Sequence, residues 1–458
     1  MEFGFGSGIL TGVRNDISGV QTPERFGALQ DVSINFQGEV KELFSTQQFP
    51  IDTARGKVKI MGKAKVAQIY AAMYNALFFG QTQVAGQLLY AYNETIASLG
   101  TSYTVANSAK TFDLRRVGTN PDYWYPLAWS SEVAVGRAIG RRFAGEPIVL
   151  YRGSQGRVMA LEDRCAHRQV PLHLGVVAGD EIKCHYHGWT YDCSGKCVSV
   201  PYLGKERLPN GVRSYPVCEL DGMIFVFPGD PSLAPGRQPT TLGSFRRPDY
   251  KTRRLYREVA YHYTFMHENL FDMNHQFMHR RYMGSIRAHC LGRDHGERWA
   301  QVEYSFSRTS GKSTLGEQVI VDLMRKRGEK KKDFSDHMRI RTDYPSQSLR
   351  VWIGRDIRET QDPVLDVWLG YTPQDAQQRT NHTFGYLSVK KPPIPGLIHA
   401  AWPFVTWFTE NIFREDKEIV EYEQRAYDSQ GADWNNEVFP AIRDLRAVLA
   451  RCGRPLES

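Results

Sequence analysis

The stretch that decides the fold of most of this chain is CAHRQVPLHLGVVAGDEIKCHYHGWTYD, residues 165–192. It contains Cys-x-His, then sixteen residues, then Cys-x-x-His, and the four residues of this pattern are Cys165, His167, Cys184 and His187. Each half is a short segment that presents one thiolate and one imidazole, and both groups are good metal ligands. The pattern therefore predicts a metal centre that is built from two loops.

Two kinds of metal centre use this donor set. Structural zinc sites usually order their ligands as a Cys pair and then a His pair, whereas Cys and His alternate here. A [2Fe–2S] cluster with mixed ligands needs two Cys on one iron and two His on the other. We therefore expect Cys165 and Cys184 to bind one iron, and His167 and His187 to bind the second. Neutral imidazoles raise the reduction potential, so the cluster could accept an electron from a ferredoxin-like donor.

The sequence around this centre suggests a small β domain and a larger mixed domain. Short apolar runs at 147–151, 158–161 and 223–227 are separated by turns that contain glycine, which is typical of short strands. Residues 230–248 are rich in proline and polar residues, as in a linker. Strand-like runs then mix with expected helices at 261–282 and 413–428. We expect a β domain over 111–230 and an α+β domain over 245–458.

A second metal site is predicted in the segment ENLFDMNHQFMH, residues 268–279. On a helix, His275 and His279 are four residues apart and share a face with Asp272. Non-haem Fe²⁺ oxygenases bind iron with two His and one carboxylate and leave positions open for O2 and substrate. A polar helix face is the alternative explanation. Two nearby histidines, His262 and His267, are competing ligands, but they precede the pattern.

Residues 1–110 differ in composition from the rest of the chain. They contain none of the seven Cys, thirteen His and nine Trp residues. Alternating apolar and polar residues at 32–36, and a similar run at 58–60, predict strands. Residues 64–79 carry apolar residues on one helical face and are followed by Gly80, which predicts a helix. We therefore expect a separate α+β segment that ends near residue 110.

Charge and hydropathy exclude some classes of protein. The net charge is +8 and the pI is about 9.0, but the densest basic run, residues 324–333, is short and interrupted by acids and glycine. It reads as a solvated loop, and we expect no nucleic-acid partner. There is no apolar run long enough for a transmembrane helix and no signal-peptide pattern at 1–20. A cytoplasmic protein without membrane contact is expected.

The two metal motifs together resemble those of Rieske-type non-haem iron oxygenases over about residues 111–458. His187-Gly-Trp189, Tyr191-Asp192 and Arg168 match the flanks of the Rieske motif. Asn269, Asp272 and His275 match the N-x2-D-x2-H motif of the mononuclear site. The second His usually comes one residue later than His279, where Arg280 stands. The resemblance also assigns a carboxylate ligand at the start of a late helix, to Asp416, with Glu415 as the alternative.

The resemblance implies a terminal oxygenase with a Rieske [2Fe–2S] domain and a helix-grip-like catalytic domain. It implies a head-to-tail homotrimer in which Asp272 bridges His187 of one chain and His275 of the next. Electrons would come from NAD(P)H through a flavin reductase or a ferredoxin, and O2 would hydroxylate or demethylate a small organic, most readily aromatic, substrate. The alternatives are an electron carrier without oxygenase activity and, for residues 1–110 alone, a virion structural module.

The virion alternative comes from a second resemblance. Residues 26–33, 41–43, 48–50, 54–56 and 63–65 resemble parts of structural proteins of tailed phages, although they include no motif that carries chemistry. The resemblance implies that two unrelated modules are fused near residue 110.

Overall fold

The structure is a computed structural model, and two compact units can be distinguished in it, Met1–Phe112 and Asp113–Ser458. In the second unit it describes residues 113–202, 208, 211–308, 335–354, 362–431, 433, 435 and 437–456. In the first unit it describes the backbone of six strands. The basic run at 324–333 lies outside the described residues.

The described part of the first unit consists of antiparallel strands: β1 (Glu2–Gly6), β2 (Ile9–Val13), β3 (Glu24–Phe44), β4 (Pro50–Val66), β5 (Ala97–Leu99) and β6 (Ser102–Thr104). The strands predicted at 32–36 and 58–60 lie within β3 and β4. The helix predicted at 64–79 is wrong for its first three residues, which belong to β4 because they pair with Leu29, Asp31 and Val32. Its remainder lies outside the described residues.

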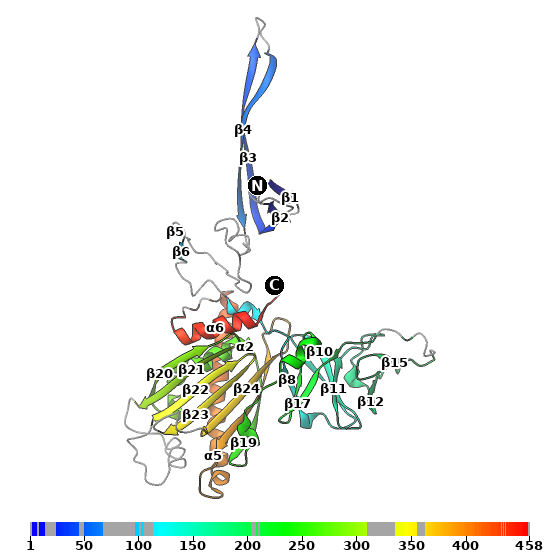
Figure 1. Cartoon of the computed structure of the whole chain (residues 1–458), viewed down its shortest axis with the longest axis vertical. Coiled ribbons are helices and arrows are strands. Elements are labelled where there is room, and N and C mark those ends of the chain that lie inside the picture. The colour runs from blue at the N-terminus through cyan, green and yellow to red at the C-terminus, as the bar shows by residue number, and fades with distance from the viewer. Residues whose placement is uncertain are drawn as a thin grey trace. The chain divides into compact units, whose positions relative to one another are not determined.

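The second unit begins with three small antiparallel sheets (Figure 1). Their strands are β8 (Tyr125–Trp129), β9 (Ala138–Phe143), β10 (Glu146–Arg152), β11 (Val158–Glu162), β12 (Val176–Ala178), β13 (Glu181–Lys183), β14 (Thr190–Tyr191), β15 (Cys197–Ser199), β16 (Ser214–Tyr215), β17 (Val217–Leu220) and β18 (Met223–Val226). The runs predicted as strands at 147–151, 158–161 and 223–227 coincide with β10, β11 and β18. Cys165 and Cys184 belong to the buried core that β10 and β11 share with the loops after β11 and β13.

A seven-stranded antiparallel sheet forms the larger domain, in the order β19-β25-β24-β23-β22-β21-β20. Its strands are β19 (Tyr250–Val259), β20 (Ile286–His295), β21 (Trp299–Arg308), β22 (Ser335–Asp343), β23 (Ser346–Gly354), β24 (Leu365–Pro373) and β25 (Asn381–Lys390). The α-helices among its described residues are α2 (Tyr263–Phe271), α3 (Arg280–Met283), α5 (Leu397–Gln430) and α6 (Pro440–Cys452). Helix α2 contacts α5, α6 and the strands β22 and β24, so it lies between the sheet and the other helices.

The remaining elements are short. The 3-10 helices are η2 (Leu114–Arg116), η3 (Ser130–Glu132), η4 (Leu172–Leu174), η6 (Pro231–Gly236), η7 (Gly243–Arg246) and η8 (Met273–Phe277). Strand β7 (Val117–Gly118) pairs with β26 (Arg454–Pro455), which ties the start of this unit to its end. Residues 230–248, expected to be a linker, contain η6 and η7 and no strand.

Two expected helices differ from those observed. The helix expected at 413–428 is part of the longer helix α5, which begins at Leu397 and contains Pro403. Proline in a helix interior normally ends or kinks the helix, so the sequence favoured a start after Pro403. The helix expected at 261–282 is three elements, α2, η8 and α3. The break lies at Asp272, whose φ of −92° and ψ of 87° are not helical and whose carboxylate accepts the N–H of Asn274 at 2.9 Å. An aspartate in this capping position starts a new helical segment.

The small sheets and the large sheet share an aromatic interface. Trp129 and Phe225 from the small sheets pack with Trp368, Phe384 and Tyr386 of β24 and β25. Trp129 lies 5.4 Å from Tyr386 between ring centroids. These aromatic side chains form one buried core that both domains share, so we expect the two domains of this unit to move as one body.

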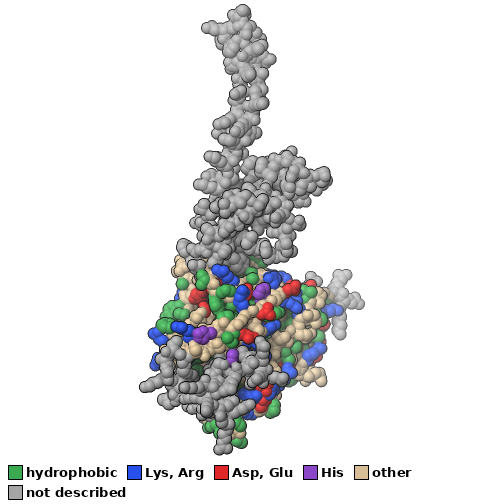
Figure 2. All heavy atoms as spheres, turned by 60° about the vertical axis from the view of Figure 1, so that its left-hand side comes forward, with side chains coloured by type: hydrophobic (Ala, Val, Ile, Leu, Met, Phe, Trp, Pro, Cys, Tyr) green, Lys and Arg blue, Asp and Glu red, His purple; other side chains and the backbone are tan. Residues whose placement is uncertain are grey.

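The surface in Figure 2 mixes charges of both signs. Basic and acidic side chains are interspersed there, and on this face the described residues form no continuous basic band. None of the helices that the structure describes has the length and apolarity needed to cross a membrane.

We predict that deletion of residues 1–110 leaves both metal centres intact. The cut falls before Asp113, whose carboxylate accepts a hydrogen bond from the Tyr427 hydroxyl at 2.8 Å, and before β7, so the contacts that hold the second unit are kept. Iron content and the spectrum of the cluster would be measured on the soluble truncated protein. Loss of the cluster signal would show instead that residues 1–110 are part of the same folding unit.

Candidate metal centres

The four residues of the first motif lie on two loops with the same backbone conformation. The loops follow β11 and β13, and in each the cysteine N–H donates to the carbonyl five residues later, at 2.9 and 2.8 Å. The N–H four residues after the cysteine donates back to its carbonyl, at 2.8 Å from Gln169 and 3.1 Å from Gly188. These two residues both have positive φ, 60° and 73°. The two loops therefore form the same kind of turn, in which the histidine lies two residues after the cysteine in the first loop and three residues after it in the second.

The loops bring the four donors together in two pairs. The thiols of Cys165 and Cys184 lie within hydrogen-bond reach of each other, and both residues are buried. The rings of His167 and His187 are 4.6 Å apart between centroids, and both residues are exposed. Thiols inside and imidazoles outside are the arrangement expected for one iron bound by two Cys and a second iron bound by two His.

Neighbouring groups restrict the thiols and the imidazoles of this site. Burial raises the pKa of Cys184, so a thiolate there requires positive charge nearby. The Tyr191 hydroxyl lies 3.2 Å from the Cys165 sulfur and accepts the Ala166 N–H. Trp189 stacks on His167 at 4.7 Å with an interplanar angle of 3° and limits the rotation of that ring. The donor set fits a [2Fe–2S] cluster.

The other two histidines of this region lie outside the donor set. His185 is exposed. His173 pairs with the buried carboxylate of Asp163 through Nδ1, and its N–H also donates to Asp163. These two contacts of Asp163 with His173 fix the position of the segment between the two loops.

Replacing Cys165 or Cys184 with Ser should abolish the cluster. A serine hydroxyl is a poor substitute for a thiolate ligand, and the site would lose one of two ligands on an iron. The purified protein should be brown and, when reduced, show an electron paramagnetic resonance signal of low average g-value, and both variants should lack it. Cys290→Ser, at an exposed thiol on β20, is the control that should keep it. A colourless parent protein with stoichiometric zinc would contradict the cluster.

The second motif forms a compact set of donors. The ligand atoms of His275, His279 and Asp416 all lie within 4.8 Å of one another. Asp416 Oδ1 is 3.1 Å from His279 Nε2 and 3.6 Å from His275 Nε2. Octahedral ligands at about 2.1 Å from one ion are about 3 Å apart, so the spacing suits a single metal ion. Two imidazoles and one carboxylate on one side are typical of non-haem Fe²⁺ sites.

The sequence predicted that one continuous helix carries His275 and His279 and that Asp416 lies at the start of a late helix, and the structure differs on both points. His275 lies in η8 and His279 caps α3, so a continuous helix does not bring them onto one face. Asp416 lies in the middle of α5 and not at the start of a late helix. The turns after Asp272 nevertheless leave the two imidazoles 5.2 Å apart between centroids.

Each donor is oriented by a further group. The Nδ1 of His279 lies 2.8 Å from Glu415 Oε2, and the Nδ1 of His275 lies 2.5 Å from the backbone carbonyl of Asp272. Asn269 donates its amide N–H to Asp416 Oδ1 at 3.2 Å. Acceptors at Nδ1 place the proton there and leave Nε2 free for a metal. Glu415, the alternative ligand in the sequence, thus orients His279 in the structure.

Asp416 supplies an anionic donor. Its burial alone would raise the pKa, but in the absence of a metal the hydrogen bond from a protonated His279 and the charges of both imidazoles lower it. The same carboxylate adds to burial in raising the pKa of the phenols of Tyr261 and Tyr371, so both remain neutral beside it. No local sequence pattern identifies these two tyrosines as neighbours, because Tyr261 follows β19 and Tyr371 lies in β24.

The competing histidines lie apart from this set. His262 Nδ1 is 2.8 Å from the Thr264 hydroxyl, and His267 Nδ1 is 3.1 Å from the Thr342 hydroxyl. Both are fully buried, and burial lowers the pKa of each, that of His267 to about 3. They are neutral core histidines in this structure.

We predict that His275→Ala, His279→Ala and Asp416→Ala each lower the iron content by about one atom per chain, because three ligands are the minimum that this kind of site uses. The spectrum of the cluster should not change. Glu415→Gln should keep the iron when it is supplied in excess, and His289→Ala, at an exposed residue of β20, should behave as the parent. Full iron in His279→Ala would rule this residue out as a ligand.

Comparisons with known proteins agree with this geometry. Residues 123–216 match the family model of the Rieske [2Fe-2S] domain. Residues 259–441 match that of the vanillate O-demethylase oxygenase C-terminal domain. Both matches begin after residue 122, so the resemblance of residues 1–110 to virion proteins stays a prediction.

Among curated proteins, the chain is 36% identical over 173 residues to 4beta-methylsterol monooxygenase of Methylococcus capsulatus, which covers 36% of this chain and 47% of that protein. It is 39% identical over 160 residues to the oxygenase component of dicamba O-demethylase of Stenotrophomonas maltophilia, covering 34% and 47%. The matched segments thus span about half the length of these relatives. The structure of dicamba monooxygenase bound to dicamba is similar over 72% of this chain and 98% of that one, with a TM-score of 0.58 and 25% identity.

The chain therefore carries the two domains of the Rieske non-haem iron oxygenases, which confirms the resemblance over about residues 111–458 and the fold class expected for that part of the chain. A Rieske domain implies a [2Fe–2S] cluster. One of the similar structures is dicamba monooxygenase with non-haem iron and dicamba, with a TM-score of 0.53 and 25% identity, and it supports Fe²⁺ at the second centre.

Proposed function

We propose that the chain is the terminal oxygenase of a short electron-transfer system and uses O2 to hydroxylate or demethylate a small organic substrate. The observation that carries this proposal is the set of three donor atoms of His275, His279 and Asp416 in a chain that also contains a Rieske domain. An electron carrier would need the cluster alone. The second donor set and the large domain around it favour the oxygenase.

We assign the individual residues as follows. When bound, the cluster would supply single electrons, and the Fe²⁺ site would bind and reduce O2. Cys165, Cys184, His167 and His187 would hold the cluster. His275, His279 and Asp416 would hold the Fe²⁺, and Asn269 would keep the Asp416 carboxylate in one orientation through its 3.2 Å hydrogen bond.

Asp272 is proposed as the bridge between the two centres. The resemblance places its carboxylate between His187 of one chain and His275 of the next; in this structure it is the backbone carbonyl of Asp272 that lies 2.5 Å from His275 Nδ1. Both hydrogen bonds to the carboxylate, from the backbone and the side chain of Asn274, end on Oδ1. Among the described residues Oδ2 has no hydrogen bond or ion pair, so it could accept an N–H from His187 of another chain.

This bridge requires a particular assembly and particular partners. The proposal includes a homotrimer arranged head to tail, because one chain's cluster would then reach the neighbour's Fe²⁺ site. It also includes a flavin reductase or a ferredoxin that delivers electrons from NAD(P)H. We place the system in the cytoplasm, where metal-binding thiols remain reduced.

The substrate class follows from the relatives and stays a proposal. Several of them are named for aromatic substrates, among them vanillate O-demethylase of a Pseudomonas strain at 36% identity over 162 residues. We therefore favour small aromatic compounds, with demethylation or monohydroxylation as the reaction.

The test is a screen for substrate-dependent O2 consumption with a surrogate reductase, NADH and a panel of methoxylated and methylated aromatic acids. At least one compound should stimulate O2 uptake and yield a hydroxylated or demethylated product. A protein with about two iron atoms per chain, an intact cluster and no second site under iron saturation would be an electron carrier, and about three iron atoms are expected for the oxygenase.

We predict that Asp272→Asn binds both metals but turns over slowly. The substitution keeps the shape and the Asn274 contacts while it removes the charge at Oδ2. Loss of a carboxylate beside a metal ligand commonly costs roughly 10–100-fold, and more is expected where it also joins two centres. Rapid mixing of the reduced, substrate-bound protein with O2 would follow reoxidation of the cluster. Reoxidation and product formation at the parent's rate would refute the bridge.

A further inference from the structure

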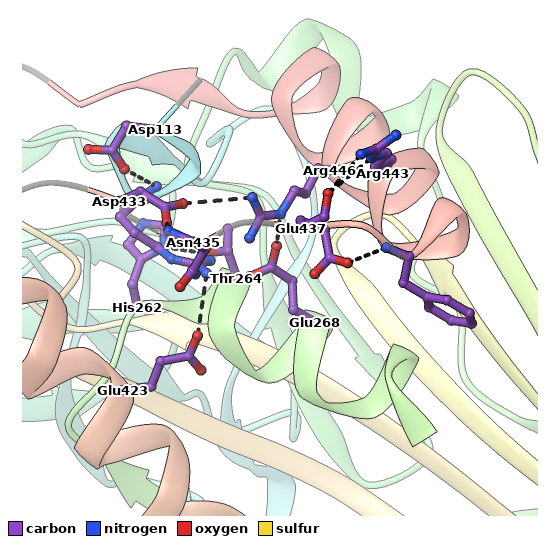
Figure 3. A network of polar contacts seen from close by, with 12 residues as sticks. Asp113, His262, Thr264, Glu268, Glu423, Asp433, Asn435, Glu437, Arg443 and Arg446 are labelled. Carbon is purple, nitrogen blue, oxygen red and sulfur yellow. Dashed lines mark hydrogen bonds and ion pairs between the residues drawn. The ribbon is translucent and has the colours of Figure 1, made fainter. Parts of the chain in front are cut away.

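A cluster of buried charges lies around Glu268 of α2 (Figure 3). Glu268 of α2 forms ion pairs with Arg115 of η2 through Oε2 and with Arg446 of α6 through Oε1. The side chain of Arg115 is 0% exposed, that of Glu268 10% and that of Arg446 11%. We call these three residues the charge cluster.

The charge cluster is held rigidly. Arg115 also donates to the Thr264 hydroxyl at 2.5 Å, and its guanidinium lies 3.5 Å from the centroid of the Phe265 ring. Arg446 has a second acid, Asp433, at 3.8 Å. Both partners of Glu268 are thus fixed by other contacts, and the Glu268 carboxylate has little freedom.

Glu268 carries the negative charge in this region. Burial alone would raise its pKa, but Arg115 and Arg446 outweigh this and lower it. The pKa of each neighbouring acid, Glu423, Asp433 and Glu437, is instead raised, with burial as the main cause. Removing the charge of Glu268 would leave two buried guanidinium groups without their main partner, which is costly.

Glu268 also begins the turn from which the metal site is built. Its backbone carbonyl accepts the N–H of Asp272 at 3.0 Å and so closes the last turn of α2. The carbonyl of Asp272 is in turn the group at 2.5 Å from His275 Nδ1. The next residue in the chain, Asn269, donates to Asp416. Two hydrogen bonds therefore connect Glu268 to His275, and the peptide bond to Asn269 together with one further hydrogen bond connects it to Asp416.

We propose that Arg115, Glu268 and Arg446 are positioning residues of the mononuclear metal site. They fix the last turn of α2, and this turn sets the orientation of His275 and Asp416. None of the three residues touches the metal donors directly, so their effect is transmitted through Asn269 and Asp272. The inference rests on the proposed role of His275, His279 and Asp416 as metal ligands.

The test uses the full chain and measures metal binding apart from activity. The mononuclear site would be emptied with a chelator, and Co²⁺ alone would be titrated back and counted by elemental analysis, with the cluster spectrum and the thermal unfolding midpoint recorded in parallel. Glu268→Gln should bind Co²⁺ about 10–100-fold more weakly than the parent and keep the cluster spectrum.

The matched control is Asp366→Asn. Asp366 is also a buried acid, 3% exposed, but it lies on β24, and its hydrogen-bond partners among the described residues are Arg350 and Ser244, which do not belong to the α2 turn. It should lower the unfolding midpoint without changing Co²⁺ affinity. Parent-like Co²⁺ affinity in Glu268→Gln, or an equal loss in Asp366→Asn, would show that the charge cluster only stabilises the fold.

A milder variant covers the case in which Glu268→Gln does not fold. Arg115→Lys keeps the charge but loses the two-pronged contact to Glu268 and Thr264, and it should bind Co²⁺ several-fold more weakly. Unchanged affinity in Arg115→Lys would overturn the proposal. If the parent itself binds no Co²⁺ that depends on His275, His279 and Asp416, the proposed metal site fails, and this outcome is distinct from failure of the positioning role.

Discussion

The structure of the larger domain depends on a carboxylate that is buried in the middle of a helix. Asp416 is 2% exposed and lies halfway along α5, where an isolated charge would be strongly unfavourable. It is tolerated because two imidazoles and one amide approach it from the segment after α2. The buried carboxylate needs polar partners. The break in the chain at Asp272 and the position of His279 at the cap of α3 bring these partners to α5.

The two metal centres bring their donor groups together in different ways. In the first, two loops with closed backbone turns present all four donors, so the sequence between Cys165 and His187 is nearly sufficient to specify them. In the second, the donors come from η8, the cap of α3 and α5, and the distance between them depends on the packing of α2 against α5. The first centre is therefore local, and the second is a product of the tertiary fold.

This difference explains what could be predicted from the sequence. The sequence singled out the four residues of the first motif and the strands around them because spacing and turns are local properties, and the structure brings these residues together. The structure also brings together His275, His279 and Asp416. Helix α5, however, was expected to start too late, and the break at Asp272 was not foreseen, since an aspartate can cap a helix as well as lie within one. The pairing of Glu268 with Arg115 and Arg446 joins residues 153 and 178 positions apart, and no local pattern reveals it.

The two loops share a hydrogen-bond pattern but differ in their side chains. At the position of positive φ the second loop has Gly188, which adopts this conformation readily, whereas the first has Gln169, an exposed residue with a side chain. The two histidines also have different neighbours. Trp189 stacks on His167, and the centroid of the Tyr186 ring lies 3.7 Å from that of His187. The two exposed imidazoles therefore have different surroundings, and a molecule that approaches this surface meets a different aromatic side chain beside each of them.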